Sequence, residues 1–128
     1  MNDQLSETVI GAAYRVHNQL GFGFLESVYE KSLSIELNKA AVNHQAQASV
    51  AVHYDDQVVG EFLCDLLIEK RLVVELKSVR QLAVAHEVQL VKYLNAMRID
   101  VGLLINFGPE KVDVKRKYRK TNTEKGGG

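Results

Sequence analysis

Residues 62–77 read FLCDLLIEKRLVVELK, and the predicted elements are arranged around this central segment. Apolar runs lie on both sides of the charged triplet EKR, which predicts two strands joined by a tight turn. Strands that are apolar on both faces usually lie inside a sheet. We therefore expect an antiparallel pair of strands at the centre of the protein.

Three charged residues interrupt these apolar runs: Asp65, Glu75 and Lys77. Glu75 and Lys77 are two residues apart and share one face of their strand, and antiparallel pairing can bring Asp65 beside Glu75. Burying an unpaired charge costs roughly several kcal/mol. Two adjacent carboxylates repel unless a divalent cation lies between them, so the pattern predicts a metal site. The alternative is a structural ion pair of Glu75 with Lys77, with Asp65 capping a turn.

The remaining sequence predicts helices on both sides of a meander of strands. Helical spacing of apolar residues predicts helices over residues 5–20, 25–41 and 83–97. Ser6 is a candidate cap for the first helix. Alternating or apolar runs predict strands over residues 46–54, 58–68, 72–79 and 101–107, and residues 111–118 form an edge strand or fray.

This order of elements predicts an α/β fold with a mixed β-sheet flanked by helices. The strand–helix–strand unit over residues 72–107 should be parallel and right-handed. A chain of 128 residues suits a single domain. We place that domain over residues 1–120 and a flexible C-terminal tail over residues 121–128.

The composition is typical of a globular protein, with 46% hydrophobic and 25% charged residues. No run approaches the roughly 18–20 apolar residues of a membrane span, and the N-terminus lacks a secretory signal. Cys64, the single cysteine, cannot form an internal disulfide. A cytoplasmic location without membrane contact is expected. Residues 110–125 carry seven basic and three acidic residues and could track phosphates, although a solubilising tail is the simpler interpretation.

Asp65, followed after nine residues by Glu75-Leu76-Lys77, resembles the D…E-x-K arrangement of the PD-(D/E)XK nuclease superfamily. Within that superfamily, residues 23–29 (GFLESVY) resemble the signature of the small GxxExxY family, as do residues 103–107 near the end. The resemblance covers about residues 5–118. Phe22 stands where members often have proline, which affects the stiffness of the loop more than the chemistry.

The resemblance implies a restriction-endonuclease-like fold and a metal-dependent nuclease. Asp65, Glu75 and the backbone carbonyl of Leu76 would bind Mg²⁺ or Mn²⁺, with Glu26 as a further ligand. The metal would activate a water, and Lys77 would orient it or stabilise the charge that develops on the phosphate. Glu26 could instead be only a carboxylate at a helix N-terminus.

Residues 89–93 (QLVKY) resemble the Q-x-x-x-Y motif of RecB-like members of the superfamily. Helical spacing places His86, Gln89 and Tyr93 on one stripe. Gln89 could act as a catalytic residue by bonding a water, a metal ligand or a phosphate, and Tyr93 and His86 could contact substrate. The alternative is ordinary packing of a helix on a sheet.

We therefore expect a nuclease that hydrolyses phosphodiester bonds of DNA or RNA, DNA before RNA, by metal-activated water. The competing hypothesis is a nucleic-acid-binding or accessory module that keeps the fold and has little or no turnover. A small chain without an obvious duplex-binding arm favours it, because such a core often needs help to hold substrate. A homodimer or a protein partner would supply that help.

Overall fold

The computed structural model describes residues 3–120 and shows a mixed five-stranded sheet with three helices. The predicted flexible tail, residues 121–128, lies outside the described residues. In chain order the elements are α1 (Asp3–Leu20), α2 (Glu26–Lys39), β1 (His44–Tyr54), β2 (Gln57–Ile68), β3 (Leu72–Lys77), α3 (Val84–Met97), β4 (Val101–Phe107) and β5 (Val112–Tyr118). The strands lie in the order β1-β2-β3-β4-β5, so the predicted α/β class is confirmed.

The sheet is mixed because one crossover interrupts a series of hairpins. β3 and β4 run parallel, as predicted, with α3 as the crossover between them. The pairs β1–β2, β2–β3 and β4–β5 are antiparallel. Residues 112–118 form a regular edge strand rather than a frayed end.

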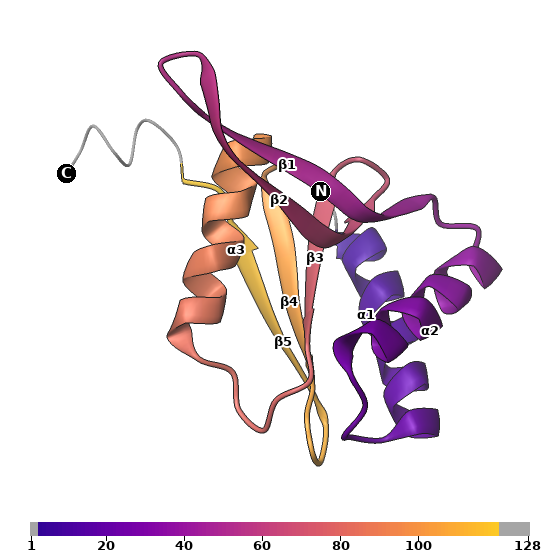
Figure 1. Ribbon diagram of the computed structural model, residues 1–128. Helices are drawn as coiled ribbons and strands as arrows, with labels where there is room; N and C mark the ends of the chain where they lie inside the picture. Colours follow the sequence, from indigo (N-terminus) through magenta and orange to yellow (C-terminus); the bar gives the residue numbers. More distant parts are fainter. Residues whose placement is uncertain (1–2, 121–128) are drawn as a thin grey trace.

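Two apolar cores lie on opposite faces of the sheet. α1 and α2 pack on one face, against residues such as Leu72, Val74 and Leu76. α3 packs on the other face, against Val73 and Leu104. Figure 1 shows the strands between these two layers of helices. Because side chains alternate along β3, Glu75 and Lys77 share the face of Val73, toward α3.

The β1–β2 hairpin changes face in its middle. Cys64 belongs to the core under α3, whereas Leu66, two residues later, belongs to the core under α1 and α2. The register passes from Ala46↔Leu66 to Ala48↔Cys64, and the intervening Gln47 has a φ of 55°. The left-handed backbone of Gln47 interrupts the alternation of side chains between the two faces, at the position opposite Asp65. Beyond it the hairpin crosses over α3 (Figure 1).

Two predicted details are wrong. Ser6 does not cap the first helix, because it lies buried inside α1, where its Oγ accepts a hydrogen bond from Arg116 at 3.0 Å. β3 ends at Lys77, two residues earlier than predicted. The buried amide of Asn106 bonds both the N–H and the C=O of Val79, at 2.9 and 2.8 Å, and so holds this residue in a loop.

Candidate metal centre

Asp65 and Glu75 lie opposite one another where β2 and β3 separate. The regular pairing of these strands ends at Leu66↔Val74. At the next position side chains take over the hydrogen bonds: Asp65 N–H donates to Glu75 Oε2 and Leu76 N–H donates to Asp65 Oδ2, both at 2.7 Å. The two carboxylates are therefore held together by the backbone of the opposite strand, and each has a second oxygen that could bind a ligand.

The electrostatics of this pair are unfavourable. Glu75 is 8% exposed, and Asp65 is half-buried. Burial raises the pKa of Glu75 to about 8, and the adjacent Asp65 carboxylate acts in the same direction. The N–H of Asp65 and the Lys77 ammonium oppose this shift in pKa without cancelling it. A divalent cation would remove the repulsion, because it favours the ionised form of both acids.

The start of α2 adds two more carboxylates. Glu26, the first residue of α2, is exposed and contributes to the raised pKa of Glu75 by repulsion. Glu30 lies one turn later, and its pKa is raised. Burial is the largest cause; the hydrogen bond from Gln47 lowers the pKa, and the charge of Asp65 raises it. The bond from Gln47 Nε2 to Glu30 Oε1 is 2.6 Å long. Sequence reasoning missed Glu30, although its spacing of four from Glu26 was a usable signal.

The donor chemistry of the site fits a hard cation. Mg²⁺ is usually held by one or two carboxylates together with waters and substrate phosphates. Asp65 and Glu75 carry carboxylate oxygens of this kind, and the backbone carbonyl of Leu76 is the further oxygen ligand expected from the sequence. Within residues 3–120, no three His, Cys, Asp or Glu side chains are grouped closely enough to hold a metal without further ligands. Water or substrate oxygens would have to complete the coordination.

α3 closes the site from the other side. Tyr93 is 9% exposed, and its pKa is raised first by burial and then by the charges of Glu75 and Asp65. Its ring packs on Phe62 of β2, with centroids 5.6 Å apart. Gln89 lies one turn earlier on the exposed part of α3. Nδ1 of His86 accepts the N–H of Ala83 at 3.0 Å at the start of the helix.

Tyr29 holds the loop that leads into α2. Its hydroxyl donates to the carbonyl of Gly21 and accepts the N–H of Phe24 at 3.3 Å. Its buried ring stacks on Phe107 with centroids 4.3 Å apart. Gly21 and Gly23 have φ values of 70° and 117°, which glycine adopts without strain. This arrangement places the first turn of α2, and hence Glu26, beside the strand fork, by which we mean the point where β2 and β3 separate.

The basic segment near the end of the described chain is largely paired. Lys117 bonds Glu87 at 3.1 Å, and Arg119 bonds Asp100 at 2.8 Å. Both pairs join the C-terminal part of the chain to α3 or to the loop that follows it. These contacts favour a structural role for the two cations over free tracking of phosphates.

Comparisons with known proteins address the family and the fold. A family model described as the PD-(D/E)XK nuclease superfamily matches residues 3–117. The crystal structure of SSO0001 is similar, with 18% sequence identity and a TM-score of 0.62. The match covers 97% of this chain and 62% of SSO0001, so the likeness shows a shared fold within a longer protein. The search of the curated proteins gave no match. None of the described helices has the length and apolar character needed to cross a membrane.

Proposed function

Because this chain belongs to the PD-(D/E)XK nuclease superfamily, we propose that it hydrolyses phosphodiester bonds of nucleic acid with a divalent metal ion. DNA is the first substrate to test and RNA the second. We further propose that the chain belongs to the GxxExxY family, because Gly23, Glu26 and Tyr29 match its signature. We also propose a cytoplasmic location.

One observation carries this proposal: two carboxyl groups face each other at the strand fork, where burial and the neighbouring Asp65 make the ionisation of Glu75 costly. A fold kept only for stability would favour an apolar pair here, because a buried unpaired charge destabilises the folded state. Strongly raised pKa values of this kind concentrate at functional sites. Mg²⁺ or Mn²⁺ is the ligand whose charge and oxygen preference fit this pair.

In the mechanism, each residue has a role that its position supports. Asp65, Glu75 and the Leu76 carbonyl would hold the cation, and Glu26 would reach it through water, because three carboxylates are not grouped closely enough among residues 3–120 for direct bonds. The bound cation would supply a water of lowered pKa and neutralise charge on the phosphate. Lys77, half-buried on the face of Glu75, stabilises the developing charge and orients the attacking water. Tyr93 belongs to the side of the site that α3 closes, where it could contact a base, and Gln89, exposed one turn earlier on α3, could bond a phosphate.

The test is metal binding followed by cleavage with the same variants. Calorimetry at about pH 8 should show Mn²⁺ binding to the wild type and none to Asp65→Asn or Glu75→Gln. Glu61→Gln is the matched control, because Glu61 is an exposed carboxylate on the same strand, and it should bind Mn²⁺ normally. Lys77→Met should also bind Mn²⁺ but lose cleavage by roughly 10²–10³-fold, the scale of one lost charge-stabilising donor.

Cleavage is measured on labelled single-stranded, duplex and flapped DNA and RNA with Mg²⁺, Mn²⁺ or chelator. No Mn²⁺ binding at millimolar concentration would contradict the proposal. Binding of Mn²⁺ without cleavage of any substrate would favour the accessory module. One observation favours the accessory module: within residues 3–120, no three metal-binding side chains are closely grouped. A partner or a second copy would then be needed to complete the site.

A further inference from the structure

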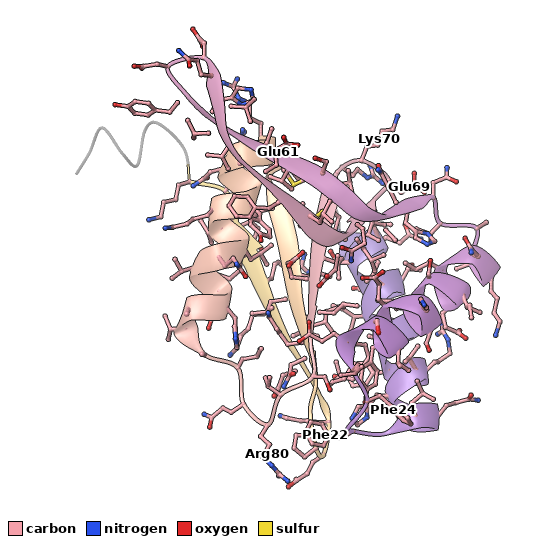
Figure 2. The ribbon with its side chains drawn as sticks, in the orientation of Figure 1. Phe22, Phe24, Glu61, Glu69, Lys70 and Arg80 are labelled. Carbon is pink, nitrogen blue, oxygen red and sulfur yellow. The ribbon has the colours of Figure 1, made fainter. Side chains whose placement is uncertain are left out.

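Two loops meet beside the candidate metal centre. The first, residues 21–25, joins α1 to α2, and the second, residues 78–83, follows β3. Ser78 Oγ donates to the carbonyl of Phe24 at 2.9 Å, and Arg80 Cζ lies 5.7 Å from the centroid of the Phe22 ring. Figure 2 shows Phe22, Phe24 and Arg80 at the same end of the molecule. We call these three residues the aromatic platform.

The aromatic platform is exposed but held in place. Phe24 is 48% exposed, Phe22 is half-buried and Arg80 is exposed. The ring of Phe24 rests edge-on against Tyr29, with centroids 6.3 Å apart and an interplanar angle of 70°. Tyr29 is itself fully buried and also accepts the backbone N–H of Phe24. A ring fixed in this way loses little conformational freedom when a ligand stacks on it.

The aromatic platform lies next to the residues proposed to do the chemistry. Ser78 directly follows Lys77, and Phe24 precedes Glu26 by two residues. Glu75 and Ser78 are three residues apart along an extended chain, or about 10 Å. A nucleic-acid strand covers that distance within about three nucleotides even at the 3.4 Å rise of a duplex. A strand bound at the metal centre can therefore reach the aromatic platform within the same binding event.

We propose that the aromatic platform stacks on unpaired bases, so that the substrate is a single strand or the unpaired end of a duplex. This inference rests on the proposed function, because the metal centre defines where the strand is cut. Aromatic faces stack on any base, whereas the bases of an intact duplex already stack on one another. The positive charges of Arg80 and Lys77 complement the phosphates of a bound strand. DNA and RNA share this chemistry.

The chain contains no tryptophan, which gives a direct test. Phe24→Trp places the single tryptophan of the chain in the aromatic platform. In chelator, where no cleavage takes place, an oligo(dT) of about 12 nucleotides should quench it, and an abasic strand of the same length should not. Tyr54→Trp is the control, because Tyr54 is 71% exposed at the far tip of the β1–β2 hairpin and should stay unquenched. Oligo(U) in place of oligo(dT) distinguishes RNA from DNA.

A second variant measures the stacking without a new ring. Phe24→Leu keeps an apolar side chain against Tyr29 but removes the aromatic face. It should weaken oligo(dT) binding roughly tenfold by fluorescence anisotropy and leave blunt-duplex binding unchanged. Equal oligo(dT) affinity of Phe24→Leu and the wild type, or an unquenched Phe24→Trp, would overturn the inference.

The failure of the two proposals can be told apart. Quenching in chelator without any Mn²⁺ binding would uphold the aromatic platform and refute the nuclease. Mn²⁺-dependent cleavage with an unquenched Phe24→Trp would uphold the nuclease and refute the aromatic platform.

Discussion

Glu75 combines deep burial with a neighbouring carboxylate, and this conflict sets its protonation. Its ordinary pKa of 4.5 rises to about 8 because burial penalises the ionised form and Asp65 repels it. Without a cation, Glu75 is therefore mostly protonated at neutral pH. Metal binding must release that proton, so the affinity of the site for Mn²⁺ should rise with pH.

The same shift makes folding stability depend on pH. The unfolded chain loses this proton near pH 4.5 and the folded protein near pH 8, so the folded state binds more protons between these values. The stabilising contribution is complete below about pH 4.5 and is lost as the pH rises through about 8. The loss is on the order of a few kcal/mol. Urea unfolding in chelator should show this decline in the wild type.

Glu75→Gln tests the sign of this effect. The variant should lack this part of the pH dependence and should exceed the wild type in stability at about pH 9, while losing Mn²⁺ binding. Glu61→Gln should keep the slope of the wild type, since Glu61 is exposed. If the free energies of unfolding of the wild type and Glu75→Gln changed with pH in parallel, the raised pKa of Glu75 would be contradicted.

At the scale of elements, the contact between α3 and β4 depends on a glycine. A Cβ at Gly102 would lie 3.0 Å from Leu90 Cδ1, 3.1 Å from Leu94 Cδ2 and 3.2 Å from the backbone oxygen of Val73. The two leucines could move, but the carbonyl belongs to the central strand. Because that carbonyl is fixed, the Cβ of an alanine at this position would displace Leu90 and Leu94, and with them α3, away from the sheet.

Gly102→Ala should destabilise the protein by about 1–3 kcal/mol, the usual cost of overpacking a core. It should also weaken the packing of Tyr93 on Phe62, because Tyr93 belongs to α3 and Phe62 to β2. Gly60→Ala is the matched control on β2. Its Cβ would meet only the Phe62 ring, at 3.7 Å, so its free energy of unfolding should change by less than about 1 kcal/mol. Equal free energies of unfolding for the two variants would refute the close contact.

The whole molecule consists of two apolar cores that share one sheet. Leu33 belongs to the core under α1 and α2, and Leu94 to the core under α3; both are fully buried. β3 and β4 supply residues to both cores, so neither core can form without the strands that the other also needs. The protein should therefore unfold in one cooperative step.

Leu33→Ala and Leu94→Ala should each lower the midpoint of that same step. Each substitution should cost about 2–5 kcal/mol, the range for a buried leucine that leaves a cavity. Circular dichroism and tyrosine fluorescence should give coincident unfolding curves in both variants. A separate transition in either variant would show that the two cores fold independently.

Local patterns in the sequence were enough to predict the order of elements, the mixed sheet and the juxtaposition of Asp65 and Glu75. Apolar periodicity and turn residues act over a few neighbours, and a tight turn fixes which residues of a hairpin lie opposite each other. Residues 62–77 carried the information on the central hairpin and its carboxylate pair, and the parallel crossover through α3 followed from the order of elements.

The surroundings of that pair depend on contacts between distant parts of the chain. Glu30 approaches Asp65 because α2 packs beside the fork, and β3 ends at Lys77 because Asn106 binds Val79 from another strand. Ser78 meets Phe24 from 54 residues away along the chain. Such contacts join residues whose separation in sequence carries no periodic signal, so packing of the whole chain brings them together.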